Sequence, residues 1–104
     1  MNLDSAAFEA KIQESGVVIL DVRTKAEFED GCITNAVNID FNGKEFSGEI
    51  SKLDKSKTYA VYCRSGRRST DAISEMRNEG FISLVHLDGG IIDWAKVGLS
   101  LVKP

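Results

Sequence analysis

A cysteine and three closely spaced arginines form the segment of this chain best suited to chemistry. Cys63 follows the apolar run Thr58–Tyr62, and Arg64, Arg67 and Arg68 lie within five residues of it. They are three of the five arginines in the chain. Because a thiolate is a nucleophile and guanidinium groups bind anions, this spacing indicates a site where a thiol reacts with a small anion.

The residues after Cys63 are expected to form a short loop that leads directly into a helix over residues 67–79. Backbone N–H groups at a helix N-terminus bind anions, and Gly66 permits the dihedral angles that a loop folded over the sulfur requires. A free thiol with a pKa near 8.5 is about 3% thiolate at pH 7, whereas thiolates at helix N-termini beside arginine reach pKa values of about 3.5–7.5. Lowering the pKa by about two needs roughly 2.7 kcal/mol, which the inward N–H groups and the arginines could supply. We therefore expect a nucleophilic thiolate that needs no histidine base.

A purely structural interpretation competes with this one. Cys63 could be a buried cysteine that ends a strand and precedes the charged first turn of a helix. That interpretation predicts acidic residues in the first turn, because cations oppose the helix dipole there. The sequence has Arg67 and Arg68 instead, which favours an anion-binding loop.

Strands and helices are predicted to alternate around this segment. Short apolar runs indicate strands at residues 17–20, 36–39, 58–62 and 84–87. Helices are expected at residues 5–13 with Ser5 as cap, between Thr24 and Gly31, and at residues 44–52, 67–79 and 91–97. Continuous apolar strands are typical of a parallel sheet that helices cover on both faces. The fold class is therefore α/β, with ligands bound at the carboxyl ends of the strands.

Length and composition fit one domain that spans residues 1–104. With 42% hydrophobic residues, the chain can build a single core that buries roughly 65% of its unfolded surface. The net charge is -3 although the loop arginines contribute +3, so the remainder carries -6 and a nucleic-acid surface is not expected. The N-terminus has neither a basic nor an apolar leader, and no window approaches 18 apolar residues. We expect a cytoplasmic protein without a membrane partner.

Two cysteines and one histidine exclude several other classes of site. They are too few for a disulfide scaffold or a four-ligand zinc site, so neither a metal nor a cofactor is expected. Cys32 is expected to be a small buried hydrophobic residue. His86 lies within a strand pattern and away from Cys63 in the sequence, so no catalytic role is expected for it.

The chain resembles a single-domain rhodanese over nearly its full length. Three ordered segments carry the resemblance. They are Asp21-Val22-Arg23 with Glu27-Phe28, Gly31-Cys32-Ile33 and Ala36-Val37-Asn38-Ile39; then Cys63-Arg64-Ser65-Gly66-Arg67-Arg68-Ser69; and then Leu87-Asp88-Gly89-Gly90 with Trp94 and Gly98. The resemblance implies a rhodanese-like three-layer domain with a mostly parallel central sheet and helices on both faces.

The resemblance further implies a thiosulfate-type sulfurtransferase. The thiolate of Cys63 would take the outer sulfur of a small anionic donor such as thiosulfate, hold it as a persulfide, and pass it to a thiol or a protein acceptor. Backbone N–H groups of the loop would hold the terminal sulfur, and the arginine side chains would orient a dianionic donor. The residues expected to bind substrate are Arg64, Ser65, Gly66, Arg67 and Arg68. The residues expected to support the site are Asp21, Arg23 and Ser69.

Loop length separates this function from a related one. Cysteine-dependent phosphatases have an arginine six residues after the cysteine, where this chain has Ser69, and the last arginine here is at the fifth position. The tighter loop suits a single sulfur better than a phosphate, so a phosphatase or arsenate reductase is the less favoured enzyme. A second alternative is a non-catalytic binding or regulatory module that docks an acidic partner on the arginines.

Several positions match or depart from the family without carrying its chemistry. Asp21 and Arg23 match it and are expected to be a structural charged pair, with Glu27 or Asp40 as a further partner of Arg23. Gly89, Gly90 and Trp94 are expected to serve a turn and the core. The family often has histidine in place of Cys32 and proline in place of Ser100. Cys32 could resolve the persulfide as a second thiol.

Overall fold

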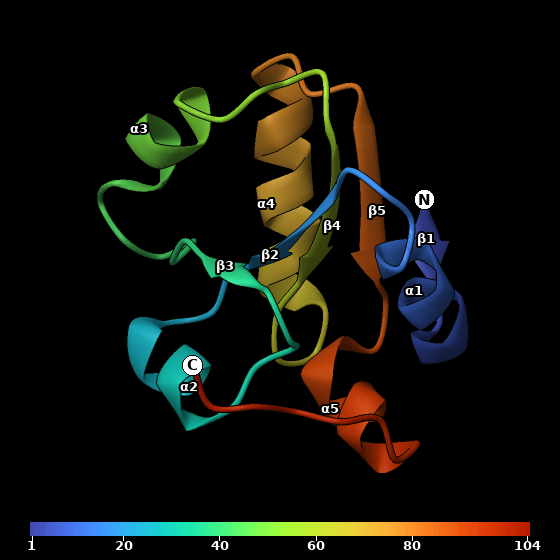
Figure 1. The fold of residues 1–104 in the computed structure, drawn as a ribbon. Helices are drawn as coiled ribbons and strands as arrows, with labels where there is room; N and C mark the ends of the chain where they lie inside the picture. Colours follow the sequence, from blue (N-terminus) through green and yellow to red (C-terminus); the bar gives the residue numbers. More distant parts are fainter.

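The computed structural model describes all residues from 1 to 104 and contains one five-stranded parallel sheet (Figure 1). The strands lie in the order β1-β5-β4-β2-β3. The strands are β1 (Asn2–Leu3), β2 (Val17–Asp21), β3 (Val37–Asn38), β4 (Thr58–Tyr62) and β5 (Ser83–Leu87). The helices are α1 (Ser5–Ile12), α2 (Lys25–Asp30), α3 (Phe46–Ser51), α4 (Arg67–Asn78) and α5 (Gly90–Lys96). The predicted α/β architecture with strands and helices in alternation is confirmed.

The central strand β4 sends alternate side chains to the two faces of the sheet. Tyr59, Val61 and Cys63 belong to the larger hydrophobic cluster, whereas Ala60 and Tyr62 belong to the smaller one. This alternation follows from the two-residue repeat of an extended chain. Cys63 therefore leaves the strand on the face that carries the larger cluster.

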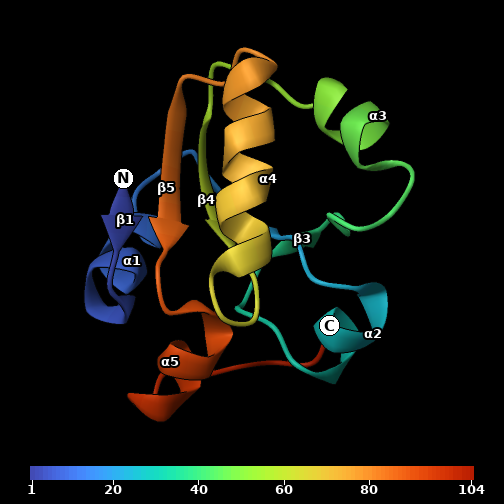
Figure 2. The same cartoon turned by 180° about the vertical axis from the view of Figure 1, so that it is seen from behind.

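Helices cover each face and complete the three layers (Figures 1 and 2). The larger cluster contains side chains from α3 and α4, and the smaller one contains side chains from α1 and α5. The long helix α4 lies along β4 and β5 on the face of the sheet that carries the larger cluster. Trp94 of α5 is 3% exposed and packs edge-on against Phe8 of α1, so its predicted place in the core is confirmed. No helix of the molecule is both long and apolar enough to cross a bilayer.

The carboxyl ends of β2, β4 and β5 lie at one edge of the sheet, and three connections meet there (Figure 1). They are the turn from β2 into α2, the loop from β4 into α4 and the turn from β5 into α5. The C-terminal segment crosses this end of the molecule to the vicinity of α2, where Cys32 and Val102 form an antiparallel bridge. This edge is the place where the fold predicts a ligand site.

Two local predictions about the N-terminus differ from the structure. The short strand β1 was not expected. It is the outermost strand next to β5 and pairs with it through residues Asn2 and Leu3. Ser5 was expected to cap α1, but the side chain of Asp4 accepts the hydrogen bond from the Ala7 N–H instead. Ser5 is the first residue of the helix, and its hydroxyl donates to Asp93 of α5. The predicted Thr24–Glu27 capping box of α2 is present.

Candidate active site

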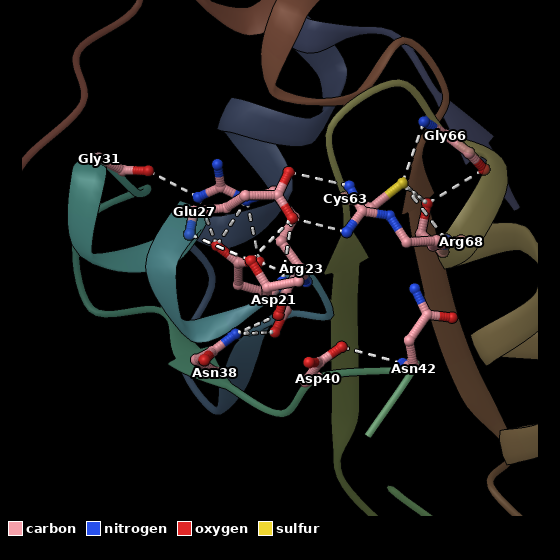
Figure 3. A network of polar contacts seen from close by, with 12 residues as sticks. Asp21, Arg23, Glu27, Gly31, Asn38, Asp40, Asn42, Cys63, Gly66 and Arg68 are labelled. Atoms are coloured by element: carbon pink, nitrogen blue, oxygen red, sulfur yellow. Dashed lines mark hydrogen bonds and ion pairs between the residues drawn. The ribbon is translucent and has the colours of Figure 1, made fainter. Parts of the chain in front are cut away.

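The segment after β4 folds over the sulfur of Cys63 and turns at once into α4 (Figure 3). Gly66 is the N-cap of α4 and has φ of 103°, a left-handed conformation that glycine adopts readily. Its N–H donates to the Cys63 sulfur over 3.1 Å. Ser69, in the first turn of the helix, donates to the same sulfur from its N–H over 3.4 Å and from its hydroxyl over 3.2 Å. The loop therefore surrounds the sulfur with donors, as expected for a thiolate site.

These donors decide the ionisation of the thiol. Burial by itself raises the pKa of Cys63, because the charged form loses its water. Hydrogen bonds from the Ser69 hydroxyl and from the N–H groups of Ser69, Gly66 and Ser65 favour the thiolate more strongly, so the pKa lies below its ordinary value. The largest lowering contributions come from hydrogen bonds and not from the arginines, to which the sequence interpretation assigned a share. The site can thus hold a nucleophilic thiolate.

The three loop arginines divide into two kinds. Arg64 and Arg67 are exposed and form no ion pair with a carboxylate. Arg68 instead forms an ion pair with Glu27 of α2. Its two terminal nitrogens lie 2.7 and 3.0 Å from the two carboxylate oxygens (Figure 3). Since the Glu27 carboxylate already occupies the guanidinium of Arg68, the uncompensated positive charge at the loop lies on Arg64 and Arg67. From the sequence, Arg68 was expected to bind substrate; its contact with Glu27, 41 residues away in the chain, was not expected.

Asp21 and Arg23 form a buried ion pair at the end of β2. Arg23 is 5% exposed, donates to both carboxylate oxygens of Asp21, and also donates to the carbonyl of Gly31. Its guanidinium lies 5.7 Å from the ring centre of Tyr62, the residue before Cys63. The expected pairing of Arg23 with Glu27 or Asp40 is wrong, because Asp21 holds the guanidinium. The pair stabilises the end of β2 beside the loop, and neither residue forms a hydrogen bond with the sulfur of Cys63.

Two glycines allow other segments to approach the loop closely. A Cβ atom on Gly66 would lie 2.3 Å from the carbonyl oxygen of Asp88, and a Cβ on Gly90 would lie 2.3 Å from the carbonyl oxygen of Arg64. The N–H of Ile91 also donates to the carbonyl of Cys63 over 2.9 Å. Gly90 thus shapes the active-site loop, a role beyond the turn expected from the sequence. The signal that could have revealed it is the double glycine directly after a buried strand.

The remaining candidates lie apart from the loop or behind it. Cys32 is 2% exposed and its backbone pairs with Val102, and burial raises the pKa of its thiol. These observations confirm it as a small buried residue. Behind the loop, the hydroxyl of Ser69 also contacts His86 of β5, a buried contact that sequence reasoning missed. No cluster of three or more histidine, cysteine, aspartate or glutamate side chains could hold a metal.

The burial of Cys63 limits which groups can reach its sulfur. Cys63 is 1% exposed and lines none of the surface pockets, whose volumes are about 270–320 Å³. A small terminal atom can therefore meet the sulfur more readily than a bulky group. The molecule is therefore a parallel α/β domain with a buried, hydrogen-bonded cysteine immediately before a helix, which is a candidate thiolate site.

Comparison with known proteins places this domain in a family. Residues 4–97 match the model of the rhodanese-like domain, so the chain belongs to the rhodanese-like domain family. It is 32% identical over 103 residues to a sulfurtransferase of Allochromatium vinosum, covering 98% of this chain and 94% of the relative. A rhodanese-related protein from Thermoplasma volcanium superimposes with a TM-score of 0.87 at 30% identity, covering 99% of this chain and 98% of that one.

The same domain also occurs inside longer proteins. The chain is 36% identical over 96 residues to the tRNA uridine(34) hydroxylase of Cytophaga hutchinsonii, which covers 89% of this chain but only 31% of that protein. The domain is therefore used both alone and as part of enzymes with other overall reactions. At the level of the family, the relatives support a sulfurtransferase.

Proposed function

We propose that this protein transfers sulfane sulfur from a thiosulfate-like donor to a thiophilic acceptor through a persulfide on Cys63. The observation that carries the proposal is the sulfur of Cys63, which accepts hydrogen bonds from Gly66 and Ser69 at the start of α4. Donors arranged in advance around the Cys63 sulfur stabilise negative charge on it, both in the attacking thiolate and in the thiolate that leaves when the acceptor takes the outer sulfur. The unpaired guanidinium groups of Arg64 and Arg67 supply the attraction for an anionic donor.

The proposed reaction has two displacement steps. The Cys63 thiolate attacks the outer sulfur of thiosulfate, a new S–S bond forms, and the old S–S bond breaks so that sulfite leaves with the electron pair. A thiolate acceptor then attacks the terminal sulfur of the persulfide, and Cys63 leaves as a thiolate. The first N–H groups of a helix have no intrahelical acceptor, so those at the start of α4 are available to bind the negative charge of the terminal sulfur. Ping-pong kinetics follow from this order of events.

The proposed partners follow from the same chemistry. They are a small anionic sulfur donor and a thiol or protein acceptor, with neither nucleic acid nor membrane involved. We assign the reaction to the cytoplasm, where thiol acceptors remain reduced, and both cysteines of the chain are free.

Mass spectrometry of the intact protein after treatment with thiosulfate tests the proposal. The wild-type chain should gain the mass of one sulfur, and reduction should remove it. Cys63→Ser should gain nothing, whereas Cys32→Ser is the matched control and should gain the sulfur normally. A wild-type chain that gains no sulfur contradicts the proposal and favours the binding module. Turnover of an aryl phosphate without any sulfur gain favours the phosphatase alternative.

A further inference from the structure

A row of polar side chains leads from the active-site sulfur through the interior to the first strand. The hydroxyl oxygen of Ser69 lies 3.2 Å from the sulfur of Cys63 and 2.6 Å from Nε2 of His86. On the other side of the imidazole, Nδ1 lies 2.9 Å from the side-chain oxygen of Asn2. The row is possible because β1 and β5 are neighbours in the sheet, with Asn2 opposite His86 (Figure 1). It connects the candidate nucleophile with the only histidine of the chain.

Burial makes this row the available path for a proton of the thiol. Cys63 is 1% exposed, Ser69 is fully buried and His86 is 3% exposed. A proton that leaves the thiol therefore has few water molecules to accept it, and the hydroxyl of Ser69 is the hydrogen-bonding side chain in contact with the sulfur. Beyond that hydroxyl, the imidazole is the first group that can hold a proton near neutral pH.

The contact with Asn2 sets which imidazole nitrogen can accept. An amide oxygen only accepts hydrogen bonds, so Nδ1 of His86 donates to the Asn2 oxygen. In the neutral ring, Nε2 then has a free lone pair that points at the hydroxyl of Ser69. While Cys63 is a thiol, its S–H can donate to Ser69 and the Ser69 hydroxyl to this lone pair, and once Cys63 is a thiolate the same hydroxyl donates to the sulfur. The three groups are thus aligned for a proton to move toward the histidine.

We propose that His86 accepts the proton of the Cys63 thiol through the hydroxyl of Ser69. The S–H bond breaks and its proton passes to the Ser69 oxygen, while the O–H proton of Ser69 passes to Nε2 of His86. The products are a thiolate that accepts a hydrogen bond from Ser69 and an imidazolium that donates to Ser69 and Asn2. Two protons shift in a relay whose net result is one proton transferred from the thiol to the imidazole; no electron is transferred and the net charge of the row is unchanged. His86 acts through Ser69, so it is a positioning residue for the nucleophile.

The charges that face His86 come from each element packed against it. Burial is the largest influence and lowers the pKa of His86, Asp88 after β5 and the backbone of Gly66 raise it, and the amino group of Met1 next to β1 lowers it. From α4, Arg77 lines a pocket of about 270 Å³ together with His86 and Met1. Burial and the Met1 amino group favour the neutral imidazole, whose Nε2 can accept the proton, whereas Asp88 and the Gly66 backbone favour the imidazolium that results. The inference concerns the free protein and does not depend on which sulfur donor it uses.

Because the chain has one histidine, NMR titration of its imidazole nitrogens tests the proposal directly. Cys63→Ser leaves His86 in place but removes the thiolate, so the midpoint of the imidazole titration should fall by about one pH unit, a tenfold change in proton affinity. The reciprocal experiment follows thiolate absorption in the near ultraviolet in a Cys32→Ser background. There His86→Gln, which keeps a polar side chain but cannot hold a proton, should raise the thiol midpoint by an equal amount.

Further variants separate proton transfer from a structural role. Ser69→Ala should uncouple the two titrations, whereas Ser74→Ala, at an exposed serine in the same pocket, should leave both midpoints unchanged. Asn2→Asp should raise the imidazole midpoint and increase the thiolate fraction severalfold at neutral pH, because a carboxylate stabilises the imidazolium. An imidazole midpoint that does not move in Cys63→Ser overturns the proposal, even where His86→Gln alters the thiol. That combination would mean that His86 only donates or accepts a fixed hydrogen bond.

Discussion

The ion pair between Arg68 and Glu27 connects the active-site loop to α2, and its removal should have a distinctive dependence on pH. Glu27→Gln removes the charge but keeps a side-chain oxygen that can accept the capping hydrogen bonds from Thr24. The change therefore isolates the contact between the carboxylate and the guanidinium. We expect the variant to fold normally and to be less stable than the wild type at neutral pH.

The size of the effect follows from the ionisation of Glu27. The hydrogen bonds from Arg68 are the main cause that lowers the pKa of Glu27 from its ordinary 4.5 to about 2. Full retention of that difference would correspond to roughly 3 kcal/mol. The two side chains are 23% and 28% exposed, so solvent screening reduces the expected loss to about 1–2 kcal/mol at pH 7.

The sign of the pH dependence is the sharper test. Because the folded-state pKa is depressed, the stabilisation is complete above about pH 4.5 and is lost as the pH falls toward about 2. Urea denaturation of the wild type and of Glu27→Gln should therefore give stabilities that converge, with more than half of the difference gone at about pH 3. Glu29→Gln changes an exposed glutamate of the same helix and should match the wild type throughout. A loss in Glu27→Gln that stays constant from pH 7 to pH 3 would refute the reasoning.

Three further predictions concern the loop and helix α3. Gly90→Ala places a Cβ 2.3 Å from the Arg64 carbonyl oxygen and should cost about 1–3 kcal/mol in urea denaturation, because the backbone must move. Gly48→Ala, where a Cβ meets nothing within 4 Å, should instead stabilise α3 by about 0.5–1 kcal/mol. Joint replacement of Arg64 and Arg67 by alanine should raise KM for thiosulfate about tenfold, since a charge-assisted hydrogen bond contributes roughly 1.5 kcal/mol. Alkylation of Cys63 by neutral iodoacetamide should change much less, and equal effects would show that these arginines activate the thiol.

Most of the fold and the centre of the site can be predicted from local patterns in the sequence. Strand β4 and helix α4 are predictable because an apolar run and a helical repeat meet at Cys63, and Gly66 marks the turn between them. The capping box of α2 is predictable because its two members are three residues apart. In each case the interacting residues are near neighbours along the chain, so that a short window of sequence contains the whole physical argument.

The features that escaped prediction depend on contacts between distant residues. Strand β1 has two residues, too few for any periodicity, and exists because its backbone pairs with β5. The Arg68–Glu27 contact spans 41 residues and the His86–Asn2 contact spans 84. Only the order of strands in the sheet brings such residues together, and a single sequence does not encode that order in any local pattern.

The position of Ser69 relative to Cys63 supports the proposal of a sulfur ligand for this loop. Successive residues of an α-helix point about 100° apart, so the fifth and sixth residues after the cysteine cannot both face it. Here the fifth residue, Arg68, turns outward to Glu27, and the sixth, Ser69, turns inward and donates to the sulfur. A neutral hydroxyl at the inward position donates to the sulfur of Cys63 itself, whereas an arginine there would place a full positive charge beside it. The structure thus ties the spacing of the motif to the direction of its side chains, and that direction is why we propose a sulfur ligand and not a phosphate.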